Sequence, residues 1–269
     1  MAGKIESGIN TETPAPLLLV TRAGAVTTVT LNRGEQFNAL SEQMIAALQE
    51  QFNRLGQDSA TRVIVLAAAG KAFCAGHDLK QMRAAPSAQY YKTLFDRCSK
   101  LMLTIQRLPQ PVIARVHGIA TAAGCQLVAM CDLAVASDNA RFAVSGINLG
   151  LFCSTPAVGL SRSVSRKQAL EMLLTGEFID AQTALQRGLV NRVTAAELLD
   201  SEIEKLAASI VAKPPKTVAI GKQLFYKQLE MGIDAAYQLA GQTMACNMMD
   251  EAAQEGVQAF IEKRTPDWK

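Results

Sequence analysis

The stretch of sequence that decides the fold is VHGIATAAGCQL, residues 116–127, which follows the apolar run PVIAR. An apolar run that ends in a Gly/Ala loop and resumes near Ala123 with helix-forming residues predicts a buried strand, a turn and a helix. A similar junction, GKAFCAGHDL at residues 70–79, follows the strand predicted at 62–68. Because ligands of open α/β folds gather at the carboxyl ends of parallel strands, the two junctions predict loops that face one binding site.

These junctions have a chemical interpretation. The N-terminus of a helix presents unpaired backbone N–H groups and a partial positive charge, and small residues let the backbone touch a ligand. Two such turns facing each other would offer two N–H donors to one oxygen, which is the geometry of an oxyanion hole. The alternative is that Gly and Ala only allow tight turns, and either junction alone is compatible with it.

Outside the junctions, strands and helices alternate up to about residue 155. Apolar and polar residues alternate on both sides of Gly24, which predicts a β-hairpin, and Ser41 is the expected N-cap of an amphipathic helix. Residues 87–107 carry apolar side chains at helical spacing. This alternation predicts an α/β fold with right-handed crossovers and a mostly parallel sheet.

Beyond residue 155 the pattern is helical, and only LVNRV at 189–193 is typical of a strand. We therefore divide the chain into a flexible N-terminal tail (1–16), a β/α core (17–200) and a helical region (201–269). The last helices carry many apolar residues, which must pack on the core or on a neighbouring subunit. We expect the helical region to mediate oligomerisation.

Length and composition exclude several classes of protein. The chain has 269 residues, of which 49% are hydrophobic and 19% charged, so it can bury an ample core and is not disordered as a whole. Lys and Arg total 27 and Asp and Glu total 24, and the resulting charge of +3 is too small to suggest a nucleic-acid partner. The six cysteines form no CxxC pair and there are only two histidines, so we expect no metal site.

The sequence also bears on the cellular compartment. No apolar run approaches the roughly 20 residues that cross a membrane, so we expect no membrane partner. The first 16 residues contain no apolar signal region, and no Arg-rich transit peptide is evident. Cysteines embedded in apolar runs are typical of a reducing compartment. We expect a cytoplasmic protein if the source is bacterial, or a mitochondrial one if it is eukaryotic.

Six segments, in order, resemble the enoyl-CoA hydratase/isomerase (crotonase) family. They are LNRGEQFNALS (31–41), KAFCAGHDL (71–79), the stretch from PVIARVHG to DLAVAS (111–137), ARFAVSGINLGL (140–151), the block 171–193 and FIEKRTPDW (260–268). The resemblance covers residues 17–269, and residues 150–164 most resemble one group within the family. It implies the ClpP/crotonase fold, a spiral of ββα turns with a C-terminal helical trimerisation region, assembled as a homotrimer or a dimer of trimers.

The resemblance further implies a ligand and an activity. Family members process acyl-CoA thioesters, as in fatty acid metabolism, and need no cofactor besides the coenzyme A that is part of the substrate. The family's oxyanion donors correspond here to the backbone N–H groups of His77 and Ala123. The two glutamates of family hydratases correspond to Gln126 and Gly146, so both carboxylates are absent. Because a positioned acid–base group is worth roughly 100- to 10,000-fold, we expect weak hydration or a different reaction.

Other residues could take over the acid–base role. The imidazole of His77 can titrate near neutrality, or it can simply be packed. A group of small or polar residues surrounds the second missing carboxylate: Ser145, Asn148, Cys153, Ser154 and Thr155. Cys153 has no evident basic partner to lower its pKa, and packing is the alternative for the whole group. We interpret His117 as structural. Replacing Gln126 and Gly146 by Glu is expected to raise hydration, unless Gly146 has a φ above zero that Glu disfavours.

The coenzyme A end is assigned through the resemblance as well. The residues expected to contact it are Gln36, Phe37, Lys71, Ala75, Asp78, Lys80, Phe260 and Lys263. Lysines at the mouth of a loop suit a 3′-phospho-ADP group as point charges, with ordinary solvated charge as the alternative. A family lysine in the first segment is replaced by Glu35, which weakens the phosphate site. Asp78 is also a candidate N-cap.

Three functions remain open from the sequence. The first is an enzyme of the enoyl-CoA hydratase/isomerase type, a lyase that stabilises a thioester enolate in an oxyanion hole. The second is a crotonase-fold thioester hydrolase or decarboxylase that relies mainly on that hole. The third is a non-catalytic acyl-CoA binding protein, which needs only the coenzyme A pocket. The loops around His77 and Ala123 argue against a wholly relaxed site and so favour an enzyme.

Overall fold

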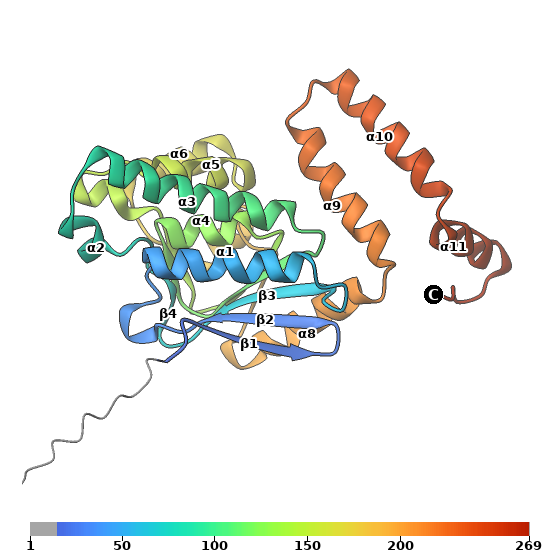
Figure 1. Ribbon diagram of the computed structural model, residues 1–269, viewed down its shortest axis with the longest axis horizontal. Coiled ribbons are helices and arrows are strands. Elements are labelled where there is room, and N and C mark those ends of the chain that lie inside the picture. The colour runs from blue at the N-terminus through green and yellow to red at the C-terminus, as the bar shows by residue number, and fades with distance from the viewer. Residues whose placement is uncertain (1–14, 269) are drawn as a thin grey trace, which may run out of the picture.

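The computed structural model describes residues 15–268, whose core is built on two β-sheets (Figure 1). The larger sheet has the strand order β1 (Leu18–Ala23), β2 (Val26–Leu31), β3 (Val63–Ala68), β5 (Val112–Val116), β7 (Leu133–Ser137) and β10 (Arg192–Thr194). β1 and β2 form the predicted hairpin, which turns at Gly24 with a φ of +58°. All other neighbours in this sheet are parallel, as predicted. Of the tail predicted for residues 1–16, residues 1–14 lie outside the described part of the chain.

A second, smaller sheet was not predicted from the sequence. Its strands are β4 (Ala72–Cys74), β6 (Ile119–Thr121), β8 (Arg141–Ala143) and β9 (Ile179–Asp180). Three times in succession the chain makes a strand of the larger sheet, then a strand of the smaller sheet, then a helix. This repeat is the predicted spiral of ββα turns. Strands of two or three residues are too short to show an alternating pattern, which is why the sequence did not reveal them.

The helices mostly begin and end where the periodicity places them. They are α1 (Glu42–Gly56), α2 (Leu79–Ala84), α3 (Ala88–Arg107), α4 (Ala123–Met130), α5 (Ser154–Ser163), α6 (Arg166–Thr175), α7 (Ala181–Gln186), α8 (Leu199–Val211), α9 (Pro215–Leu229), α10 (Ile233–Met248) and α11 (Glu251–Glu262), with short 3-10 turns η1 (Gly34–Gln36), η2 (Ser145–Leu149) and η3 (Ala196–Leu198). Ser41 caps α1 as predicted, since its hydroxyl accepts a hydrogen bond from Met44 N at 3.1 Å. The strand predicted at 189–193 is displaced, because β10 begins only at Arg192.

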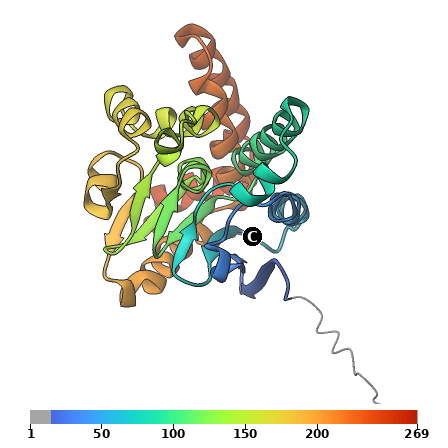
Figure 2. The same ribbon diagram turned by 90° about the vertical axis from the view of Figure 1, so that its left-hand side faces the viewer.

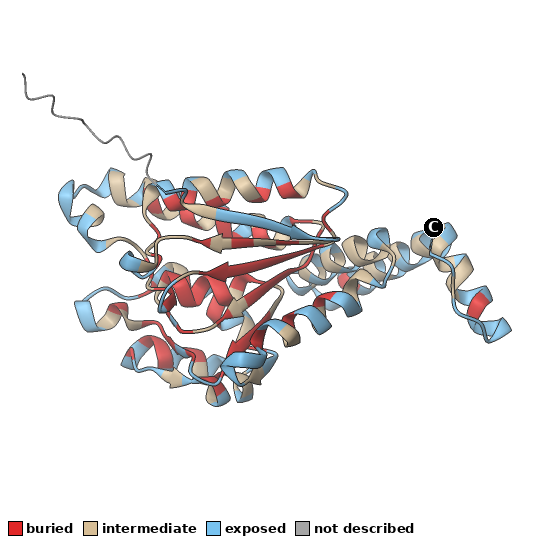
Figure 3. Ribbon diagram, turned by 90° about the horizontal axis from the view of Figure 1, so that it is seen from below, coloured by how far each residue is buried: buried red, intermediate tan, exposed pale blue. Residues whose placement is uncertain are grey.

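The core lies on both faces of the larger sheet. On one face α1, α3 and α4 cover the strands, and large side chains such as Phe52, Leu66 and Leu101 are fully buried there. On the other face a smaller cluster joins β3 and β5 to α8 through Leu199 and Ile203. Figure 2 shows the strands lying between these helices, and Figure 3 shows burial concentrated on them. Packed side chains therefore cover both faces of the sheet from which the two junction loops start.

The last three helices, α9 to α11, form an arm that leaves the core (Figures 1 and 3). A buried network holds the root of this arm. Lys222 of α9 pairs with Asp132 at 2.7 Å and donates hydrogen bonds to the carbonyls of Ile105 and Gln110 at 2.8 and 2.9 Å. The hydroxyl of Tyr226 donates to the same carboxylate at 2.9 Å. Further out, the arm exposes much apolar surface, so its predicted role in oligomerisation stays a prediction.

Candidate active site

The turns that follow β4 and β6 pack against each other, backbone to backbone. Gly76 has a φ of +91°, and a Cβ on it would lie 3.0 Å from the Cβ of Ala122 and 3.3 Å from Ala123 N. A Cβ on Gly124 would lie 2.1 Å from the carbonyl oxygen of Cys74. Only hydrogen fits at Gly124, and at Gly76 the positive φ and the close approach of Ala122 both disfavour a side chain. The structure therefore brings together the two junctions that the sequence singles out.

Two backbone donors point to no acceptor at this meeting point. Within residues 15–268, no hydrogen bond uses the N–H of His77 or that of Ala123. Ala123 is the first residue of α4, where helical N–H groups lack an intrahelical partner. Its neighbour Ala122 has φ 50° and ψ −120°, a conformation that favours glycine and costs a non-glycine residue about 1–3 kcal/mol. Such strain is typical of a turn held in place for a function.

A cavity of about 320 Å³ opens beside the two turns. Ala75, His77 and Ala122 line one part of it, and Gly146 and Cys153 line another. Most of the remaining wall is apolar and is made by Leu79, Met82, Phe95, Leu149, Leu151 and Phe152. A small apolar cavity beside two unpaired backbone donors on apposed turns suits an acyl chain whose carbonyl oxygen lies near those turns.

The imidazole of His77 is packed rather than solvated. Its ring meets Phe95 edge to face, with 5.5 Å between the ring centroids, and neither ring nitrogen makes a hydrogen bond of ordinary geometry. Burial lowers the pKa of this imidazole below its ordinary value of 6.5, because the charged form loses its hydration, and the nearby backbone of Leu40 opposes this shift only in part. The ring is therefore neutral at physiological pH. Of the two interpretations left open by the sequence, the geometry favours the packed histidine.

The positions of the two missing glutamates differ in their surroundings. Gln126 is 3% exposed on α4, does not line the cavity, and its amide oxygen has no hydrogen-bond partner. Gly146 lines the cavity, and a Cβ there would lie 2.6 Å from the carbonyl oxygen of Leu151 and 2.7 Å from Cys153 Sγ. The φ of Gly146 is not in the left-handed region, so the expectation that φ would disfavour Glu at this position is wrong. What disfavours Glu is the lack of space for its side chain.

Several of the small and polar residues near Gly146 are engaged with other groups of the protein. Ser145 Oγ and Thr121 Oγ1 are 2.8 Å apart, and Ser154 Oγ donates to the carbonyl of Phe152 at 3.3 Å. Burial raises the pKa of the Cys153 thiol, a shift that a hydrogen bond from the backbone of Gly146 only partly opposes. These contacts favour packing over nucleophilic or acid–base roles.

Residues predicted to hold coenzyme A gather near the first turn. The carbonyl of Phe37, next to Gln36, accepts a hydrogen bond from Ala75 N at 3.0 Å. The side chains of Lys71 and Lys80 are exposed on the same segment of chain. Asp78 acts as the N-cap of α2, since its carboxylate accepts from Lys80 N at 2.9 Å and Gln81 N at 3.1 Å.

Two other predicted contacts lie far from this region within one chain. Phe260 and Lys263 belong to the end of α11, at the opposite end of the molecule from β4 and α2 (Figure 1). Phe260 is 85% exposed. The structure therefore does not bring these residues to the cavity of their own chain.

Asn38 was missed in the sequence, although it holds the first turn. It is completely buried, and its amide donates to the carbonyls of Ala69 and Ala72, both at 2.8 Å. Its oxygen accepts from Arg33 N at 2.9 Å. His117 has a comparable structural role, since its Nε2 donates to the carbonyl of Gly70 at 2.9 Å. The sequence offers only one signal for this role: Asn38 is a polar residue directly before the apolar Ala39 and Leu40, which lead into the helix that Ser41 caps.

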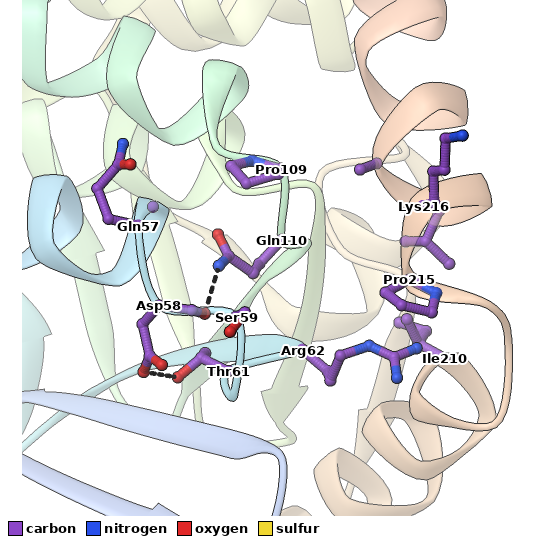
Figure 4. Close-up of a pocket in the computed structure, with 13 residues that line it drawn as sticks. Gln57, Asp58, Ser59, Thr61, Arg62, Pro109, Gln110, Ile210, Pro215 and Lys216 are labelled. Carbon is purple, nitrogen blue, oxygen red and sulfur yellow. Dashed lines mark hydrogen bonds between the residues drawn. The ribbon is translucent and has the colours of Figure 1, made fainter. Parts of the chain in front are cut away.

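A second cavity, of about 440 Å³, lies at the root of the arm (Figure 4). Its polar groups are largely taken by the protein itself. The amide nitrogen of Gln110 donates to the carbonyls of Leu55 and Asp58, at 2.7 and 3.2 Å, and Arg62 donates to the carbonyl of Val211 at 3.4 Å. The first cavity therefore remains the candidate active site. Among residues 15–268, no group of His, Cys, Asp and Glu side chains could hold a metal ion, and no helix could span a membrane.

The spiral of ββα turns, with the turns after β4 and β6 packed against each other, defines a class of α/β protein built from ββα repeats. The chain belongs to the enoyl-CoA hydratase/isomerase family, whose sequence model matches residues 21–269. The resemblance of residues 150–164 to one group of that family is confirmed as well. The chain is 47% identical to enoyl-CoA hydratase domain-containing protein 3, mitochondrial, of Xenopus laevis, over 94% of this chain and 86% of the relative.

Solved structures agree with this relationship. A crystal structure of an enoyl-CoA hydratase of Mycobacterium smegmatis is 66% identical, with a TM-score of 0.93 over 94% of this chain and 99% of the other. The crystal structure of human enoyl-CoA hydratase domain-containing protein 3 is 43% identical, with a TM-score of 0.91 over 94% and 100%. The predicted fold class is thereby confirmed.

Proposed function

We propose that the chain binds an acyl-CoA thioester with its carbonyl oxygen between the backbone N–H groups of His77 and Ala123. The observation that carries this proposal is the pair of unused donors where the two turns meet, beside an apolar cavity. When a proton leaves the α-carbon, negative charge develops on that oxygen, and fixed donors stabilise it without reorganising. The loss of one such donor typically costs about 100- to 1,000-fold in rate.

The reaction that we propose is enolate chemistry of the hydratase/isomerase type, with slow hydration of simple enoyl-CoA. An amide at Gln126 cannot accept a proton near neutral pH, and Gly146 offers no side chain. The neutral, packed ring of His77 does not replace them. The missing carboxylates also favour one alternative, a thioester hydrolase or decarboxylase that uses the same two donors. A non-catalytic acyl-CoA binding protein would need only the coenzyme A pocket and not the two donors.

For the assembly we propose a homotrimer or a dimer of trimers formed through the arm. Its exposed apolar side chains support this: Phe225, Ile233, Tyr237, Met244, Met249 and Phe260. A subunit contact would also give Phe260 and Lys263 a route to coenzyme A on another chain. Light scattering that finds a stable monomer at micromolar concentration would contradict the assembly.

Because the Xenopus relative is a mitochondrial protein by name, we propose a mitochondrial location if the source is eukaryotic and a cytoplasmic one if it is bacterial.

The test combines binding and turnover. Calorimetry with crotonyl-CoA should give saturable binding, while loss of the enoyl absorbance should be far slower than with a two-glutamate hydratase. Gln126→Glu should raise hydration by at least about 100-fold, and the matched control Gln126→Met should leave it unchanged. Rapid hydration by the wild-type protein would show that another group supplies the base. Gly146→Glu is left out of this test, since Leu151 and Cys153 leave no room for it.

A further inference from the structure

The segment before α1 holds two consecutive residues in a backbone conformation that favours glycine. Phe37 has a φ of 51° and Asn38 a φ of 52°, both in the left-handed region. The side chain of Phe37 is 55% exposed, so its packing does not hold the segment in place. Asn38, in contrast, is completely buried. Its side chain accepts a hydrogen bond from Arg33 N and donates one each to the carbonyls of Ala69 and Ala72, and such contacts are what strained backbone needs in order to persist.

The backbone on both sides of Asn38 is hydrogen-bonded to the turn that follows β4. Before it, the carbonyl of Phe37 accepts from Ala75 N at 3.0 Å. After it, Leu40 N donates to the carbonyl of Gly76 at 2.7 Å. The conformation of Asn38 therefore determines where these two partners of the turn stand.

The second of these hydrogen bonds acts on the peptide unit that contains one of the two candidate donors. The carbonyl of Gly76 and the N–H of His77 belong to one planar, trans peptide unit, so they point in opposite directions. The bond from Leu40 N, which fixes the carbonyl, therefore also fixes the direction of the N–H. It also polarises the unit, which strengthens the N–H as a donor. Residues 15–268 supply no acceptor to this N–H, so its direction is left for a ligand to use.

We propose that Asn38 is a positioning residue, which acts through Leu40 and Gly76 to aim the N–H of His77 at the thioester oxygen. This inference rests on the proposed function and deepens it, because it names the side chain on which the direction of one donor depends. Asn38 does not line the cavity beside the turns, so it acts on the donor and not on the ligand. A displacement of about 1 Å in a positioned group can cost about 100-fold in rate, which makes such a clamp matter for the chemistry.

The test compares two variants of Asn38 with a matched control. Asn38→Gly removes all three side-chain hydrogen bonds, while glycine adopts a left-handed φ without strain. Asn38→Ser keeps one hydroxyl donor and supplies the result if circular dichroism finds Asn38→Gly unfolded. The control is Gln110→Ala, because Gln110 is also a buried amide that donates to two carbonyls, but it lies at the root of the arm.

The measurement is infrared difference spectroscopy of butyryl-CoA labelled with ¹³C at the thioester carbonyl, with calorimetry to establish saturation. Hydrogen bonds to the carbonyl oxygen move its band to lower frequency. We expect Asn38→Gly to lose about half of the wild-type shift, since one of two donors loses its direction, and Asn38→Ser to lose a smaller part. Gln110→Ala should keep the whole shift. The dissociation constant should rise by no more than about tenfold in either Asn38 variant, which corresponds to one ordinary hydrogen bond.

The outcomes separate the two proposals. If butyryl-CoA bound to the wild-type protein shows no shift, the proposed function is wrong and the inference falls with it. If the wild-type protein shifts the band and the folded Asn38 variants keep the whole shift, the proposed function stands and the positioning role is refuted. An equal loss in Gln110→Ala would also refute it, because weakened packing anywhere would then move the band. A loss confined to the Asn38 variants would support the inference.

Discussion

Replacing Lys222 by Met should detach the root of the arm from the core. The side chains of Lys222 and Asp132 are only 7% and 12% exposed, and the ammonium group satisfies the carboxylate together with two backbone carbonyls, those of Ile105 and Gln110. Breaking a buried ion pair by removing one partner typically costs 3–5 kcal/mol, because the remaining charge stays buried. Asp132 keeps its bonds from Val112 N at 2.6 Å and from Tyr226, so we expect about 3 kcal/mol.

This loss should depend on pH. Burial raises the pKa of Asp132, and Lys222 opposes that shift, so removing Lys222 raises the pKa of the carboxyl further. A carboxyl whose pKa is higher in the folded state than in the unfolded state makes the protein less stable as pH rises through that window. The deficit of Lys222→Met against the wild-type protein should therefore be smaller at pH 5 than at pH 7.5.

The assay is urea unfolding followed by circular dichroism, with Lys227→Met as the control. Lys227 is exposed on the same helix, and its replacement should change the free energy of unfolding by no more than about 0.5 kcal/mol. The double variant Lys222→Met with Asp132→Asn should lose less than the sum of the single losses, because no charge is left unpaired. A loss below about 1 kcal/mol in Lys222→Met would refute the reasoning.

Three further predictions concern the site. Gly124→Ala should lower the free energy of unfolding by about 3 kcal/mol and abolish thioester binding, because the new Cβ would collide with the carbonyl oxygen of Cys74. The control Gly221→Ala has open space around it and should be neutral or stabilising in the same urea titration. Ala122→Gly should raise the free energy of unfolding by about 1 kcal/mol, since it relieves a strained φ, and an unchanged urea midpoint would contradict this. Burial depresses the pKa of His77 in the folded state, so the contribution of His77 to the free energy of unfolding is complete above pH 6.5 and is lost as the pH falls. Below pH 6.5 the free energy of unfolding of the wild-type protein should fall by up to about 1.4 kcal/mol per pH unit more than that of His77→Gln. Parallel pH profiles of the two proteins would count against the packed, neutral ring.

The sequence predicted those parts of the fold that depend on local pattern. The hairpin at Gly24, the cap at Ser41 and the two strand–turn–helix junctions are encoded by residues near one another in the chain. The family resemblance supplied the spiral order. The short strands of the second sheet were missed, because their stability comes from pairing with distant strands and not from their own few residues.

Details of the site that depend on distant contacts could not be predicted either. The lack of space at Gly146 arises from Leu151 and Cys153, whose approach depends on how the η2–α5 connection folds back. The buried clamp of Asn38 joins carbonyls more than 30 residues away. The pattern of apolar residues identifies which side chains are buried, but it does not identify which buried polar groups meet.

The central claim is that the N–H groups of His77 and Ala123 polarise a thioester carbonyl. Infrared difference spectroscopy of butyryl-CoA labelled with ¹³C at that carbonyl measures this directly, because hydrogen bonds to the oxygen weaken the C=O bond. At saturating protein, we predict that the carbonyl band moves to lower frequency than in free butyryl-CoA. A bound ligand whose carbonyl band stays at the frequency of the free thioester would contradict the claim.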